Sequence, residues 1–259
     1  MSTVALTLRQ VRFTNKAFWR NPASAFFTFA FPLMFLVIFT TLFGTGTLTL
    51  PSGEEVKQST AYVPAIAAFS VITACYTNIA ISVTFARDAG VLKRTRGTPL
   101  PPVAYLLGRI IHAALVALLL VAICTAFGVA FYGAKLPTST LPAFTVTLIV
   151  GAASFCTLGL AVTSIIPNAD ASPAIVNATV LPLLFLSGVF IPITSTTPAW
   201  VDAVGKIFPI RHFYDAMVNA FFPVSGGSGF RWVDLAVVAG WGLAGLIVAV
   251  RFFSWEPRR

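Results

Sequence analysis

The sequence predicts an all-α polytopic membrane protein with six transmembrane helices, an N-terminal amphipathic interfacial helix and a re-entrant outer region between spans five and six. Three observations predict this class. Of the 259 residues, 57% are hydrophobic and only 10% are charged, whereas soluble domains carry about 25% charged residues. The mean hydropathy is +0.88. The apolar residues gather in stretches of about 20, the length of a membrane-spanning helix. This composition excludes a soluble enzyme and a disordered chain.

Residues 1–22 are expected to form a helix that lies in the membrane interface. Arg9, Arg12, Lys16 and Arg20 recur at intervals of three and four residues, so a helix places them on one stripe. An adjoining arc is apolar and comprises Val4, Leu8, Val11, Phe18 and Trp19. A basic face beside an apolar face is typical of interfacial helices. A plain basic flank with one aromatic anchor is the alternative.

The six spans are expected at about 24–43, 61–85, 104–132, 142–166, 173–191 and 232–253. Pro182 and the pair Ser187-Gly188 interrupt the fifth span. Residues 194–231 are less apolar but rich in aromatic side chains, which favours a helix that dips back into the outer leaflet. An extracellular loop with aromatic anchors is the alternative. The candidates for an outer gate in this region are Ser187, Gly188, Pro192 and Trp200.

The distribution of charge predicts the orientation in the membrane. Six spans place both termini on one side, and most of the 17 basic residues fall on that side. The positive-inside rule therefore predicts that both termini are cytoplasmic. The same rule explains the net charge of +9 without a nucleic-acid partner. Cys75, Cys124 and Cys156 lie far apart in apolar stretches, so free buried thiols are expected.

Several kinds of chemistry are missing from the sequence. No Asp or Glu lies in the middle of an expected span, although ion-driven carriers commonly keep an ionisable group there. His112 is the only titratable candidate at depth, and a hydrogen bond between helices is favoured over a proton relay. No G-x-S-x-G, H-E-x-x-H or P-loop motif occurs. We therefore expect no catalytic residue, metal ligand or bound cofactor, and any energy for uphill transport would come from another polypeptide.

The segment RDAGVLKRTRGTPLPP, residues 87–102, is the most charged part of the chain and joins the second and third spans. Gly90 and Pro99 bound a stretch that could form a short helix against the membrane face. Its polar side would be free to bind a soluble partner, but a plain positive-inside anchor explains the pattern equally well. The residues concerned are Arg87, Asp88, Gly90, Lys93, Arg94 and Arg96.

Polar side chains within the expected spans are candidates to line a transport path. They are Thr73, Thr77, Asn78 and Asn177. Hydrogen bonding between helices is the slightly favoured alternative, because such side chains commonly join transmembrane helices.

Two segments carry a resemblance to the ABC-2 type transporter permeases. RDAGVLKRTRGTPLPP resembles the family's cytoplasmic loop, in which an acidic residue, a glycine and a basic cluster precede a proline-rich turn. LPLLFLSGVFIPI (181–193), followed by Pro198-Ala199-Trp200 and Phe208-Pro209, resembles the fifth span and return region. The resemblance covers nearly the whole chain, so residues 1–259 are expected to form one ABC-2 transmembrane domain. It is strongest to the drug-exporting branch, similar to daunorubicin resistance permeases, with the polysaccharide-exporting branch as a neighbour.

The resemblance implies a half-transporter in a bacterial plasma membrane. Two permease chains, identical or different, would form the path, and two ATP-binding subunits carrying ATP and Mg would dock beneath them. Residues 86–103 would be the coupling loop, with Asp88 where the family often has Glu, and residues 1–22 the connecting helix. Hydrophobic or amphipathic compounds, either drugs or lipids, would be exported. The alternatives are export of a polysaccharide or lipid-linked glycan, an ATP-independent carrier and an intramembrane enzyme.

Overall fold

The computed structural model describes residues 2–49, 55–193, 197–224 and 227–256. These residues form a helical bundle with one short two-stranded sheet at an end. Within the described part of the chain, five helical segments are long and apolar enough to cross a membrane. They are α2 (Pro22–Phe43), the continuous run α3–η1–α4 (Gln58–Asp88), α6 (Pro102–Tyr132), α7 (Leu141–Val162) and α11 (Trp232–Phe252). The prediction of an all-α polytopic membrane protein is confirmed.

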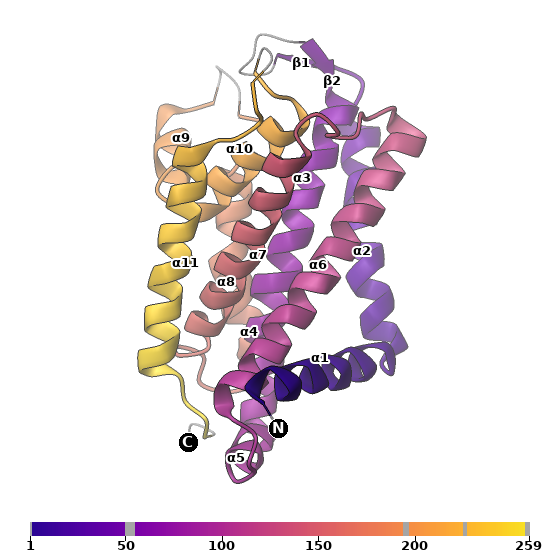
Figure 1. Cartoon of the computed structure of the whole chain (residues 1–259). Coiled ribbons are helices and arrows are strands. Elements are labelled where there is room, and N and C mark those ends of the chain that lie inside the picture. The colour runs from indigo at the N-terminus through magenta and orange to yellow at the C-terminus, as the bar shows by residue number, and fades with distance from the viewer. Residues whose placement is uncertain (1, 50–54, 194–196, 225–226, 257–259) are drawn as a thin grey trace.

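The N-terminal helix α1 (Thr3–Trp19) lies across one end of the bundle, whereas α2, α6 and α11 run along it (Figure 1). The Ser2 hydroxyl caps it by accepting a hydrogen bond from the Ala5 amide. Its inner side packs on α6 at Gly108, where a Cβ atom would lie 2.6 Å from Cγ of Gln10. The indole of Trp19 stacks on Phe29 of α2 at 5.7 Å. These contacts hold α1 crosswise, as an interfacial helix requires.

The second span differs from the uniform helix expected at 61–85. It consists of α3 (Gln58–Ile72), the π-helix η1 (Thr73–Thr77) and α4 (Asn78–Asp88). At Gly159 the backbone of α7 approaches η1 so closely that a Cβ atom would lie 2.7 Å from the Tyr76 carbonyl oxygen. Single π-helical turns inside α-helices frequently occur at functional sites. The sequence pattern gave no sign of this turn, because the contact comes from a distant helix.

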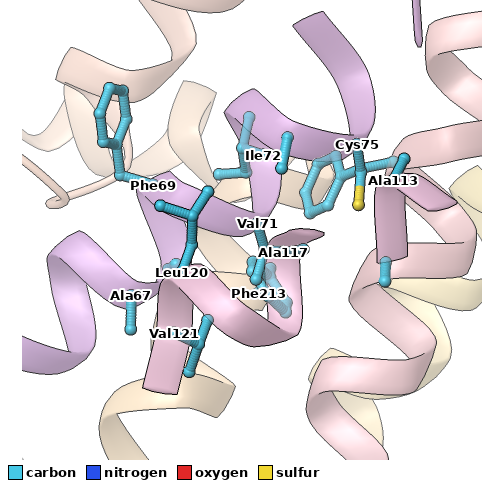
Figure 2. Close-up of a cluster of buried hydrophobic side chains, with 14 of the residues drawn as sticks. Ala67, Phe69, Val71, Ile72, Cys75, Ala113, Ala117, Leu120, Val121 and Phe213 are labelled. Atoms are coloured by element: carbon cyan, nitrogen blue, oxygen red, sulfur yellow. The ribbon is translucent and has the colours of Figure 1, made fainter. Parts of the chain in front are cut away.

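The core lies where α3, η1, α6 and α10 (Pro209–Phe221) meet (Figure 2). Phe213 of α10 is completely buried and contacts Phe155 of α7 edge-on at 5.2 Å. Gly151 of α7 leaves the space that the Phe213 ring occupies. Cys75, in this cluster, is buried and free, as are Cys124 and Cys156, which confirms the expectation for the thiols. Helix α10, which lies within the expected outer region 194–231, thus forms part of the core.

The fifth expected span, 173–191, is only partly helical. Helix α8 (Ser172–Leu186) has 15 residues and is therefore about 22 Å long, which is short of the roughly 30 Å hydrocarbon core. It ends because Gly188 takes a positive φ of 89°, a conformation that favours glycine. Phe190 is nevertheless buried and stacks on Phe39 of α2 at 5.4 Å. Aromatic packing thus continues where the helix stops.

The two ends of the bundle carry different elements (Figure 1). Strands β1 (Thr47–Thr49) and β2 (Glu55–Lys57) pair antiparallel at one end, together with α9 (Ala199–Gly205) and α10. This hairpin stands where only a polar loop was expected. Helix α1, the short α5 (Val91–Arg96) and the end of α11 lie at the opposite end. The start of the first helix and the end of the last therefore share one end of the bundle.

Candidate functional site

Helix α5 projects from the end of the bundle that also carries α1 (Figure 1). Gly90 precedes it with a φ of +67°, which lets the chain reverse sharply after α4. Leu92 is completely buried and anchors the helix. Its exposed side is basic and consists of Lys93, Arg94 and Arg96. Among the described residues, no carboxylate pairs with these three, so α5 presents a positively charged surface.

Arg87 lies directly before this surface but is only 2% exposed. Its guanidinium donates hydrogen bonds to the carbonyl oxygens of Thr163 (3.0 Å), Ile166 (2.8 Å) and Pro167 (3.1 Å) at the end of α7. Its Nε donates to Asp88 at 3.2 Å, and the second Asp88 oxygen accepts from a backbone amide in the same turn. We call Arg87, Asp88 and the backbone of 163–169 the Arg87 clamp.

The clamp bears on two expectations. Arg87 was placed in the coupling loop with Lys93, Arg94 and Arg96, and the structure buries its side chain among backbone carbonyl groups, whereas those three side chains are exposed. The fourth span was expected to reach residue 166, but α7 ends at Val162. The physical reason is the same in both cases, because the carbonyl groups after Val162 bond to Arg87 instead of continuing the helical ladder.

The basic residues of α1 are exposed, as a helix facing phosphates requires. Arg9, Arg12, Lys16 and Arg20 all lie on its exposed side. The guanidinium of Arg9 lies 5.7 Å from the ring centre of Phe13. No carboxylate in the described ranges pairs with any of the four. Together with α5, they make this end of the bundle strongly basic.

The candidates for a transport path do not gather around one cavity. Thr73 donates its hydroxyl to the carbonyl oxygen of Phe69 within its own helix. The Thr77 hydroxyl is buried and has no hydrogen-bond partner in the described chain. Asn78 lines a cavity beneath α1, whereas Asn177 is exposed on α8. The four residues thus have separate surroundings.

A contact that the sequence did not suggest joins η1 to α8. The hydroxyl groups of Tyr76 and Thr179 lie 2.8 Å apart. Both residues line an apolar cavity of about 160 Å³ that also contacts Phe155 and Trp241. The available signal was a Thr at 179, a polar residue within a mostly apolar helix.

At the opposite end, the structure brings together three of the four outer-gate candidates. Gly188 and Pro192 line a small cavity with Tyr214, and the adjacent Ser187 is buried. The Ser187 carbonyl oxygen accepts a hydrogen bond from Arg211 at 3.1 Å. Trp200 stands apart from this group on α9, with 63% of its surface exposed.

An ionic network that sequence reasoning missed joins the outer helices. Arg211 of α10 pairs with Asp215 at 3.0 Å and Asp202 of α9 at 3.9 Å. Burial raises the pKa of the Asp215 carboxyl, and the neighbouring Arg211 opposes that rise. The Nδ1 atom of His212 lies 2.5 Å from a carboxylate oxygen of Asp234 of α11, within hydrogen-bond distance. Arg231 also pairs with the buried Asp234 carboxylate and supplies the charged partner that it requires. The network thus joins α10 to α9 and α11.

Together these features define a multi-pass α-helical membrane protein with a crosswise terminal helix and a basic protruding helix at one end. Residues 3–222 match the family model of the ABC-2 type transporter. The chain therefore belongs to the ABC-2 type transporter family, and the match supports a permease subunit of an ABC-type transporter. No curated protein matches the chain.

Proposed function

We propose that this chain is the permease subunit of an exporter driven by ATP that a separate subunit hydrolyses. Two such ATP-binding subunits, with their ATP and Mg, dock on the coupling loop 86–103 of two permease chains. The observation that carries the proposal is α5, a protruding helix with three exposed basic side chains on a buried leucine anchor. Basic side chains that pair with no carboxylate in the described part of the chain suit a complementary acidic surface on another protein.

The Arg87 clamp gives this docking surface a mechanical role. Movement of α5 passes directly into α4, and Arg87 transmits it to the end of α7 through three hydrogen bonds. Helix α4 continues into η1, which touches α7 again at Gly159. In this proposal Arg87 and Asp88 position the coupling helix, while Lys93, Arg94 and Arg96 contact the partner. The connecting helix α1 carries the same movement to α6 at Gly108.

The exported compounds are hydrophobic or amphipathic, either drugs or lipids, as in the daunorubicin resistance branch. The apolar cavity at Tyr76 and Thr179 supports this class, because it offers two hydroxyl groups in otherwise apolar walls. Export of a polysaccharide or lipid-linked glycan is the second candidate within the same mechanism. The protein works in a bacterial plasma membrane with both termini in the cytoplasm, where the exposed basic residues of α1 and α5 belong.

The test uses the permease co-expressed with its ATP-binding subunit and reconstituted in lipid vesicles. Arg94→Ala removes an exposed contact of α5 and is expected to reduce substrate-stimulated ATPase activity. Arg251→Ala is the matched control, because Arg251 is an exposed arginine at the end of α11. Equal stimulation in Arg94→Ala, Arg251→Ala and wild type would contradict docking on α5.

A further inference from the structure

A cavity of about 350 Å³, with several polar groups in a largely apolar lining, lies between the crosswise helix α1 and the first turns of α4 and α6. Figure 1 shows α1 crossing the bundle at this level. The cavity is lined by residues of α1, α4 and α6 and by Val91 at the start of α5, and the polar residues of its lining include Gln10, Asn78, Ser82, Arg109 and His112. None of the residues that line it is acidic. It belongs neither to the α5 surface nor to the cavity at Tyr76.

Arg109 places a fixed positive charge in this cavity. Its Nε donates to the Tyr105 hydroxyl at 2.9 Å, and one terminal nitrogen donates to the Ser82 hydroxyl at 3.1 Å. The Tyr105 ring centre lies 5.1 Å from the guanidinium carbon. No carboxylate in the described part of the chain pairs with Arg109. The side chain is therefore oriented, half-buried and not neutralised.

His112, one helical turn from Arg109, adds a buried polar atom without a hydrogen-bond partner among the described residues. The side chain is 4% exposed, and the partnerless atom is Nε2. The Phe18 ring packs edge-on against the imidazole at 5.5 Å. A buried polar atom without a partner is unfavourable and rare in native proteins. A ligand atom that accepts a hydrogen bond from Nε2 would satisfy it.

From these two residues we infer that the cavity binds the phosphate group of an anionic phospholipid. Guanidinium groups recognise phosphate oxygens through paired, charge-assisted hydrogen bonds. An interfacial helix lies at the depth of lipid headgroups, and Phe13 of α1, which is 55% exposed, extends the cavity wall for the start of an acyl chain. The bound lipid holds α1 against α6. The same chemistry would accept a soluble phosphate, so the test separates the two sources.

The experiment measures thermal stability and lipid affinity of the purified full chain in a neutral detergent. Phosphatidylglycerol is added in one series, phosphatidylcholine with the same acyl chains in a second, and inorganic phosphate in a third. Wild type is expected to gain several degrees in Tm with phosphatidylglycerol alone. Arg109→Gln is expected to weaken phosphatidylglycerol binding about tenfold, the effect of one lost charge-assisted hydrogen bond. A gain in Tm with inorganic phosphate but not with phosphatidylglycerol would assign the cavity to a soluble anion and overturn the lipid proposal.

Two further variants separate ligand binding from folding. Arg251→Gln removes the same charge elsewhere and should retain the full response. His112→Leu replaces a partnerless polar atom with an apolar group, so it should raise the Tm of the lipid-free protein while reducing the shift caused by phosphatidylglycerol. If His112 serves only to stabilise the fold, His112→Leu would lower the Tm of the lipid-free protein and leave the Tm shift caused by phosphatidylglycerol unchanged. Equal phosphatidylglycerol responses in wild type, Arg109→Gln and His112→Leu would overturn the inference.

Discussion

Removing the guanidinium of Arg87 tests how strongly the Arg87 clamp stabilises the fold. Arg87→Ala deprives three carbonyl oxygens at the end of α7 of their donor and leaves Asp88 without its cation. Breaking a buried pair by removing one partner costs about 3–5 kcal/mol. Asp88 is 21% exposed, so water can partly replace the guanidinium there. We therefore expect a loss near the lower limit, about 3 kcal/mol.

The assay is thermal unfolding of the purified chain in detergent, in which the fraction of monodisperse protein is measured as the temperature rises. For a chain of this size, 1 kcal/mol shifts Tm by about 2–4 °C, so Arg87→Ala should lower Tm by about 6–12 °C. Arg94→Ala is the control, because its exposed side chain contributes within about 0.5 kcal/mol. If Arg87→Ala has the same Tm as the Arg94→Ala control, the Arg87 clamp does not stabilise the fold.

Other substitutions test the helix contacts by the same measurement of Tm. Gly159→Ala should destabilise by about 1–3 kcal/mol, because the new Cβ would meet the Tyr76 carbonyl oxygen at 2.7 Å. Gly240→Ala, with no atom within 4 Å of the new Cβ, should instead stabilise by about 0.5–1 kcal/mol, and a loss there would contradict the packing described. Tyr76→Phe should cost about 1 kcal/mol by removing the hydrogen bond to Thr179. Gly90→Ala should cost about 1–2 kcal/mol from its positive φ alone, and an unchanged Tm would exclude that conformation.

Long apolar runs predict most of the bundle from the sequence. Helices α2, α6 and α11 begin and end within a few residues of their expected bounds, because length and hydropathy decide membrane spans. The crosswise α1 was also predicted, because a basic stripe beside an apolar arc is a local pattern typical of interfacial helices. Local patterns also placed a short basic helix after Gly90, where the structure has α5.

Features that depend on distant contacts could not be predicted. Arg87 stands next to a charged cluster and looks exposed in the sequence, but carbonyl groups about 80 residues later bury and satisfy it. The π-helical turn at Tyr76 accompanies a close approach by Gly159 of another helix. His212 and Asp234 meet only because α10 folds against α11. In each case the energetic reason for the local structure lies outside the local sequence.

Docking of an ATP-hydrolysing partner on α5 is tested by affinity purification of the chain from native membranes. The triple variant Lys93→Glu, Arg94→Glu and Arg96→Glu reverses the exposed charges and leaves the Arg87 clamp intact, and Arg251→Glu is the control. We expect a P-loop ATPase to co-purify with wild type and with the control, and to be lost from the triple variant. Retention of that ATPase by the triple variant, or its absence from wild type, would contradict docking on α5.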